Sequence, residues 1–212
     1  MINKKFIMLS VLLVTLTLSA VSAGNNITSD IVGVSDDTDL DILKENNTNA
    51  KSFSELDEAI NGNNDSDIYL DCDYEFNSTS DSKGVEIRRE VAVHGNGHTL
   101  DANNNDLGIL YTNSKVILKD MIFVNSRHGA LFYGTAINCT FKNNSADYGR
   151  AINYVNATDC TFLENSAKYG GAAEHGTPIN CTFTRNTAGF GGAVNNGNAT
   201  NCKFENNHAK FE

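Results

Sequence analysis

The stretch that decides the fold runs from residue 139 to residue 201 and reads CTFKNNSADYGRAINYVNATD, CTFLENSAKYGGAAEHGTPIN and CTFTRNTAGFGGAVNNGNATN. These consecutive segments have 21 residues each, and a fourth copy begins at Cys202. A looser copy over residues 116–123 lies 18 residues before the first strict one. A fixed period of this kind is typical of a solenoid, in which each repeat is one structural unit that stacks on the next.

Equal repeat lengths place the same position of each repeat directly above its counterpart. We therefore expect ladders of cysteine (Cys139, Cys160, Cys181, Cys202), phenylalanine (Phe141, Phe162, Phe183, Phe204) and asparagine (Asn144, Asn165, Asn186, Asn207). Stacked, buried phenylalanines would supply much of the cohesion. Each ladder asparagine is expected at a bend, where it tolerates a left-handed backbone and passes hydrogen bonds to its neighbours along the stack.

A fourth recurring position is aromatic and consists of Tyr148, Tyr169, Phe190 and Phe211. If this strip faces outward, it forms a flat platform for sugar rings or for another protein. If it faces inward, it belongs to the core. We expect a partly buried structural stack.

The residues around each cysteine, such as 137–141, alternate between apolar and polar, which indicates a strand with its odd-numbered members facing inward. Asn, Thr and Gly dominate the repeats, so a helical solenoid is disfavoured. One turn of a parallel β-solenoid uses about three short strands, and successive turns lie about 4.8 Å apart. The period therefore predicts an all-β, single-stranded parallel β-helix with coils of about 21 residues.

The chain before the repeats divides into three segments. Residues 1–23 have the pattern of a secretory signal peptide, in which two lysines precede a short apolar run and a small-residue cleavage site. Residues 24–51 are expected to be an acidic flexible linker, and residues 52–84 a cap helix with the first strands. The helix is indicated by the capping-box pattern from Ser52 to Glu55. Residues 85–212 then form the β-helix.

The charge of the chain excludes one class of partner. The net charge is −10, and it becomes −12 when the two lysines of the signal segment are removed. Most of the acidic excess lies in residues 24–83, and the repeats are nearly neutral. A nucleic-acid partner needs a basic footprint, so we expect none. The export signal predicts a secreted or cell-surface protein.

The repeat pattern NCTFxxNxA followed by YGGA or FGGA, as in residues 180–193, resembles the repeats of polymorphic outer-membrane proteins. It is still more similar to the adhesin-like surface proteins of methanogenic archaea, which belong to the pectate-lyase-like β-helix class. The segment HGNGHTLDANN, residues 94–104, is similar to one that often opens their first regular coil. The resemblance covers about residues 53–212 and implies a right-handed β-helix with a surface role. Arg150, where a second glycine is expected, departs from the pattern.

The function expected from this resemblance is a non-enzymatic, adhesin-like module that binds surface glycans, matrix or proteins of other cells. A polysaccharide lyase or hydrolase is the alternative from another class, and a structural spacer of the cell envelope is a third. No catalytic residues can be nominated, since the triplet 127–129 (Arg-His-Gly) is the only suggestive one and no pair of acids recurs. We expect no cofactor. Because the repeats stop without a capping element, we expect either that the chain is a fragment of a longer gene product or that it self-associates end to end.

Two further groups of residues could carry chemistry. The cysteines lack the paired spacing of a zinc site, so we expect buried free thiols and no metal. Asparagines in glycosylation sequons are candidate sites for glycans, although several are expected on poorly accessible strands. They are Asn26, Asn46, Asn64, Asn77, Asn138, Asn143, Asn156, Asn180 and Asn198.

Overall fold

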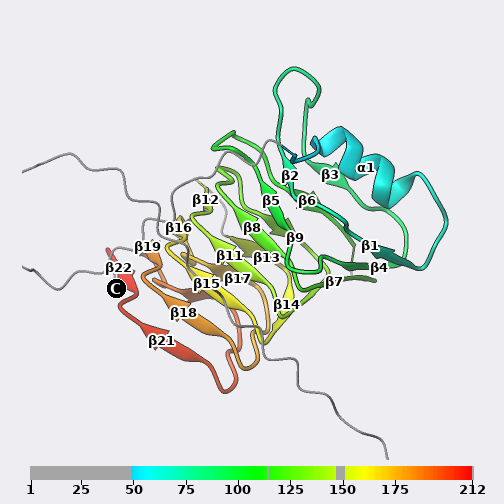
Figure 1. The fold of residues 1–212 in the computed structure, drawn as a ribbon. Coiled ribbons are helices and arrows are strands. Elements are labelled where there is room, and N and C mark those ends of the chain that lie inside the picture. Colours follow the sequence, from blue (N-terminus) through cyan, green and yellow to red (C-terminus); the bar gives the residue numbers. More distant parts are fainter. Residues whose placement is uncertain (1–48, 114, 147–150, 212) are drawn as a thin grey trace, which may run out of the picture. The chain divides into compact units, whose positions relative to one another are not determined.

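The computed structural model describes residues 49–113, 115–146 and 151–211. This part of the chain forms about seven coils of a parallel β-solenoid, with one short helix on the N-terminal side (Figure 1). The predicted β-helix with an N-terminal cap helix is thereby confirmed. The signal peptide expected over residues 1–23 and the linker expected over 24–51, apart from its last three residues, lie outside the described residues.

Four parallel sheets run along the solenoid, and each coil contributes one short strand to most of them. Sheet I contains β1 (Asp67–Tyr69), β4 (Val91–His94), β7 (Val116–Lys119), β10 (Thr135–Ile137) and β14 (Asn156–Thr158). Sheet II contains β2 (Tyr74–Glu75), β5 (Thr99–Asp101), β8 (Ile122–Val124), β11 (Thr140–Lys142), β15 (Thr161–Leu163), β18 (Thr182–Thr184) and β21 (Lys203–Glu205). Sheet III contains β12 (Ser145–Ala146), β16 (Ser166–Tyr169), β19 (Thr187–Phe190) and β22 (His208–Ala209). Sheet IV contains β3 (Val85–Glu86), β6 (Leu110–Tyr111), β9 (Leu131–Phe132), β13 (Ile152–Asn153), β17 (Ala173–Glu174) and β20 (Val194–Asn195).

The phenylalanines of sheet II stack in register through the centre of the solenoid. Phe141 pairs with Phe162, which pairs with Phe183, and their ring centroids lie 5.0 and 4.6 Å apart. These rings are fully buried, whereas Phe204 in the last coil is half exposed. Phe123 extends the stack one coil earlier, at the 18-residue offset of the looser copy. Burial of each ring contributes about 1.5–3 kcal/mol.

The ladder asparagines tie each coil to the next by hydrogen bonds inside the solenoid. Asn165 shows the pattern: its Nδ2 donates to the Phe141 carbonyl at 2.9 Å and to Asn186 Oδ1 at 3.0 Å. Its Oδ1 accepts from the backbone N–H of Asn144 at 3.0 Å. Asn144, Asn165 and Asn186 are buried, so the amides satisfy backbone groups that water cannot reach.

The ladder asparagines are not the left-handed residues of the bend, and that expectation was wrong. The positive φ belongs to the preceding residue of each coil, namely Asn143, Glu164, Arg185 and Asn206, with φ between 52° and 57°. This residue turns the chain outward, and the following asparagine therefore points inward. The inward amide can then reach the backbone of the neighbouring coils.

A second correction concerns the strand expected over residues 137–141. A corner divides this stretch into β10 and β11, because Asn138 adopts a left-handed backbone with φ 51°. Cys139 and Phe141 point inward, but Ile137 is only partly buried, and its counterpart Ile179 is 41% exposed. The alternation of apolar and polar residues thus continues across a corner. At a corner, an alternating pattern no longer indicates whether a side chain faces the core or the solvent.

Helix α1 (Phe53–Asn61) packs against the first coil through Phe53, Leu56 and Ile60, all buried. Ser52 caps it, and the capping box with Glu55 is complete. The buried Asp81 carboxylate also binds the helix N-terminus, accepting from the backbone N–H of Phe53 at 3.0 Å and of Ser54 at 2.8 Å. A carboxylate is favourable there because the helix dipole is positive at that end.

The asparagine ladder predicts a large penalty for truncating one amide. Asn165→Ala leaves the Phe141 carbonyl and the Asn144 N–H buried without these partners, and each unsatisfied group costs about 1–3 kcal/mol. We expect the free energy of unfolding in denaturant to fall by about 3 kcal/mol. Thr161→Ala, at an exposed position of β15, is the control and should change it little. A loss below about 1 kcal/mol for Asn165→Ala would contradict the role of the ladder.

The Asp81 contact predicts a pH dependence of the cap. Burial alone would raise the pKa of Asp81, but hydrogen bonds from Asn77, Ser54 and Phe53 outweigh it and hold the pKa below its ordinary value. The stabilisation is therefore present above about pH 4 and is lost as the pH falls through the lowered pKa. Asp81→Asn should lower the thermal midpoint at neutral pH, and the two proteins should converge in acid. A difference that stays constant down to about pH 2 would refute this assignment.

Candidate binding surfaces

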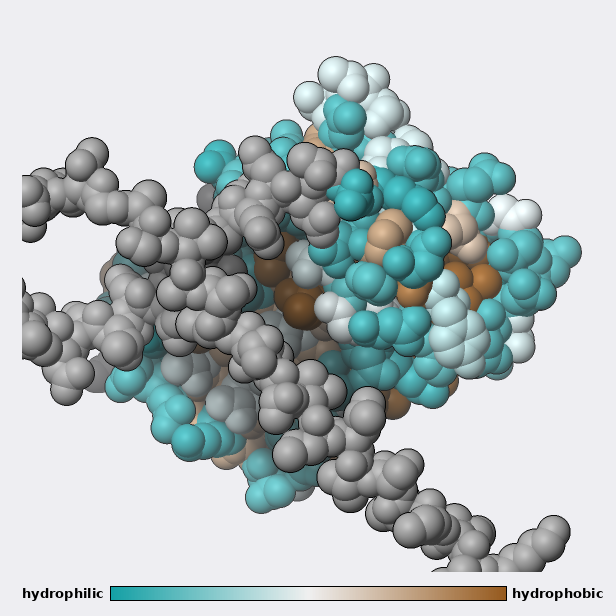
Figure 2. Space-filling view, viewed as in Figure 1, coloured by the Kyte–Doolittle hydropathy of each residue, from teal (hydrophilic) through white to brown (hydrophobic). Residues whose placement is uncertain are grey.

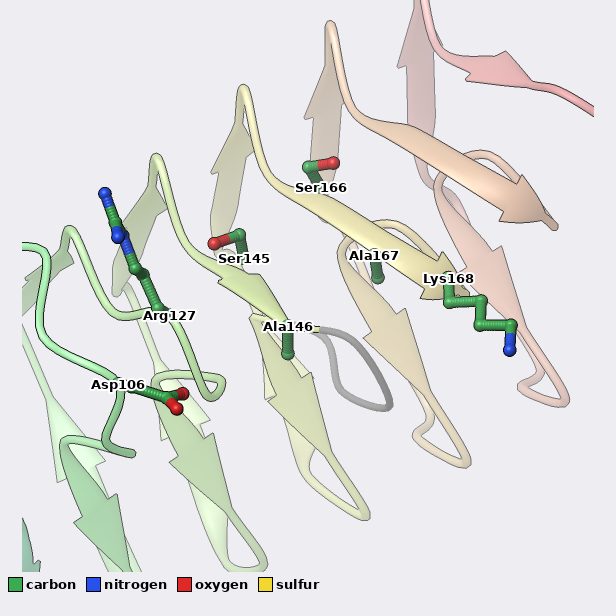
Figure 3. A pocket seen from close by; sticks show the side chains of 7 residues that line it. All are labelled: Asp106, Arg127, Ser145, Ala146, Ser166, Ala167 and Lys168. Carbon is green, nitrogen blue, oxygen red and sulfur yellow. The ribbon is translucent and has the colours of Figure 1, made fainter.

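A groove of about 680 Å³ runs across successive coils beside sheet III (Figure 3). Its described lining residues are Asp106, Arg127, Ser145, Ala146, Ser166, Ala167 and Lys168. Figure 3 shows that Ser145 and Ser166 occupy equivalent positions on neighbouring coils with their hydroxyl oxygens turned in opposite directions, and that Lys168 lies farther along the strand that carries Ser166. The groove thus combines small and hydroxyl side chains with two cations and one carboxylate.

The triplet considered for catalysis, residues 127–129, lies at this groove. Arg127 lines it, and His128 Nδ1 lies 3.7 Å from Asp106 Oδ1, with both side chains largely exposed. Glycoside hydrolysis uses two carboxyl groups about 5–10 Å apart. Among the described lining residues, Asp106 is the only acid, and the described part of the chain contains no cluster of three or more residues that could hold a metal ion.

The predicted aromatic strip lies at the surface, at the end of the sheet III strands. Tyr169 is half-buried, Phe190 is 39% exposed and Phe211 is 60% exposed, while Tyr148 lies outside the described residues. The Tyr169 and Phe190 rings stack with centroids 5.4 Å apart and planes 9° apart. Stacked rings cover each other's faces, so Tyr169 and Phe190 form a partly exposed stack that presents ring edges and not the flat platform of the alternative reading.

A second aromatic column, which sequence comparison of the repeats missed, consists of Tyr133, Tyr154 and His175. Tyr133 is 50% and Tyr154 is 49% exposed, and His175 is exposed as well. The column is spaced by the same 21 residues as the ladders, and that spacing was the signal that could have revealed it. It escaped notice because its members are not identical and the next position is Asn196.

The family model described as "Putative pectate lyase-like adhesive domain" matches residues 47–209. The chain belongs to this family. The matched range contains α1, the groove and the column of Tyr133, Tyr154 and His175. No curated protein and no solved structure matched the chain. Among the described residues, the helix of this adhesive domain is too short to span a membrane.

The cysteine ladder of the adhesive domain lies at the corner between sheets I and II. Cys139, Cys160 and Cys181 are buried, Cys202 and Cys72 are partly buried, and all five are free thiols. The backbone N–H of Cys139 donates to Cys160 Sγ at 3.4 Å. The hydrogen bond between the Cys139 and Cys160 thiols is the main reason why the pKa of Cys160 is raised to about 12.

These environments predict how the thiols react. The thiolate is the reactive form, and burial raises the pKa of both Cys202 and Cys72. Iodoacetamide at neutral pH should therefore label the native protein slowly and only at Cys202 and Cys72, whereas the unfolded protein should take up five labels. Peptide mass spectrometry identifies which cysteines carry the label. Rapid labelling of Cys160 in the native protein, or missing labels after unfolding without reductant, would contradict the thiol ladder.

The described sequon asparagines are all at exposed positions, contrary to the expectation that several are poorly accessible. They are Asn64, Asn77, Asn138, Asn143, Asn156, Asn180 and Asn198, and Asn26 and Asn46 lie outside the described residues. The reason is that these asparagines occupy loops, left-handed corners and outward strand positions. Two of the side chains are held by acids, since Nδ2 of Asn138 donates to Asp120 and that of Asn180 to Asp159.

Proposed function

We propose that the chain is a non-enzymatic, adhesin-like module, secreted or at the cell surface, that binds glycans, matrix or other cells through the lateral surface of its β-helix. Membership of an adhesive-domain family supports this proposal. The observation that carries it is the presence of two partly exposed aromatic columns on that surface. Aromatic side chains are enriched at recognition surfaces because they offer large contact areas with little loss of conformational entropy.

The composition of the lateral surface favours recognition of polar ligands. Figure 2 shows that hydrophilic residues dominate the described surface on the face in view. The outward strand positions carry mostly Thr, Asn, Ser and isolated charges, as in the row Thr140, Thr161, Thr182 and Lys203 of sheet II. Hydroxyls and amides repeated on every coil suit a ligand that is itself a repeating, hydrogen-bonding chain or a dense surface of such chains.

The enzymatic alternative would use the groove beside sheet III. Arg127 and Lys168 could bind an acidic polysaccharide there, but a hydrolase needs a second carboxyl group besides Asp106. The arrangement of the described residues therefore favours binding over hydrolysis, and the assay below tests for lyase activity. The spacer alternative assigns no ligand to the exposed columns and explains them only by the stacking of their rings between coils.

Two parallel assays test this proposal. The full chain should bind saturably to at least one surface among a glycan array, immobilised matrix and whole cells, and heat-unfolded protein should not. Incubation with pectin and other polyuronides should release no unsaturated or reducing ends. Release of such ends would favour the lyase or hydrolase, and a folded protein that binds none of these surfaces would favour the spacer. Tyr169→Ala with Phe190→Ala tests whether the sheet III strip contributes to binding.

A further inference from the structure

The column of Tyr133, Tyr154 and His175, called the corner column below, occupies a backbone position that does not favour aromatic residues. The three residues lie at the corner between sheets IV and I and have φ values of 65°, 55° and 52°. Bulky side chains are rare in this left-handed region, and asparagine is preferred, as at Asn196 in the next coil. Left-handed corners recur at non-glycine positions throughout the solenoid, for example at Asp120, Glu164 and Arg185, so the unusual feature of this corner is its aromatic side chains and not its backbone conformation.

The rings of the corner column stack on one another along the solenoid axis. The centroids of Tyr133 and Tyr154 lie 5.4 Å apart, and those of Tyr154 and His175 lie 4.6 Å apart, with planes within 12° of parallel. Ring faces are therefore covered, and the edges with their polar tips face solvent. Ring edges carry the positive part of the aromatic quadrupole, so they favour oxygen-rich ligands over apolar ones.

The side chains that flank the corner column are uncharged or buried. The row beside it consists of Thr135 and Asn156 on sheet I and Thr177 in the next coil, whose Oγ1 donates to Asn156 Oδ1 at 2.6 Å. On the sheet IV side, Phe132 and Asn153 are uncharged, and the Glu174 carboxylate is buried. A ligand lying along the column thus meets hydroxyl, amide and aromatic groups but no exposed acid of this strip.

We propose that the corner column binds an uncharged, extended polysaccharide that lies parallel to the solenoid axis, with one sugar on each coil. This inference rests on the proposed adhesive function and assigns its ligand class. The argument is one of spacing, since the rings repeat at nearly the distance between strands, about 4.8 Å. An extended β-1,4-linked hexose chain advances by nearly the same distance per sugar, and successive sugars are turned over relative to one another. Each coil can therefore contact one sugar, and every second coil meets the same edge of the chain.

The test compares two glucans that differ only in linkage. Cello-oligosaccharides are extended, whereas malto-oligosaccharides curve, so only the former can follow a straight column. Binding of each series, from disaccharide to hexasaccharide, is measured by calorimetry with the full chain. The protein is produced in a host that attaches no N-glycans, because Asn156 beside the column lies in a glycosylation sequon.

The test variant is Tyr133→Asn with Tyr154→Asn, because asparagine suits the left-handed backbone and should preserve the fold. The control is Tyr69→Ala, an exposed ring on the ordinary strand β1 that stacks on His94.

We expect affinity to rise about tenfold from cellobiose to cellohexaose, and to fall about tenfold for cellohexaose in the asparagine variant but not in Tyr69→Ala. Three results would overturn the inference: equal binding of maltohexaose and cellohexaose, unchanged affinity for cellohexaose in the asparagine variant, or no binding of any glucan. Adhesion of the wild-type chain to cells or matrix is measured alongside. If the chain adheres to cells or matrix but binds no glucan, only the assignment of the ligand is wrong. If the chain does not adhere at all, the proposed adhesive function is wrong.

Discussion

The structure depends on the hydrogen bonds that the buried asparagine amides make between successive coils. Each amide joins its own coil to the backbone of the coil before it and to the asparagine of the coil after it, as Asn165 does with Phe141 and Asn186. This geometry recurs because equivalent positions lie directly above one another in successive coils, and it is kept across the 18-residue coil, where the backbone N–H of Ser126 donates to Asn144 Oδ1. The phenylalanine stack and the cysteine ladder follow from the same constraint, and so do the columns on the outer surface.

A surface built in this way repeats each exposed group at the spacing of β-strands. A single favourable contact between one side chain and one ligand unit is therefore available again on the next coil, so weak contacts can add up along an extended ligand. The corner column and the sheet III strip use this property with aromatic residues, and the outward rows of sheets I and II use it with Thr and Asn. The groove beside sheet III differs, since Asp106, Arg127 and Lys168 are not repeated on every coil.

The period of 21 residues was enough to predict the fold class and the residues that lie above one another, and the capping box from Ser52 to Glu55 was enough to predict the cap helix. It could not show which way each side chain faces, because left-handed corners such as Asn138 and Asn143 reverse the alternation that a strand would keep. For this reason the ladder asparagines were assigned to the wrong backbone conformation and the expected strand over 137–141 was not found. The corner column was missed because only Tyr133 and Tyr154 are identical, and His175 and Asn196 follow at the same position.

The central claim is that residues 21 apart in sequence are in contact from coil to coil. The most direct measurement is nuclear Overhauser contacts between phenylalanine rings in a protein labelled only at phenylalanine. The account predicts a chain of contacts from Phe141 to Phe162 to Phe183, whose centroids lie 5.0 and 4.6 Å apart. Absence of contact between Phe162 and Phe183 in the folded protein would contradict the stacked register and the surface columns that it creates.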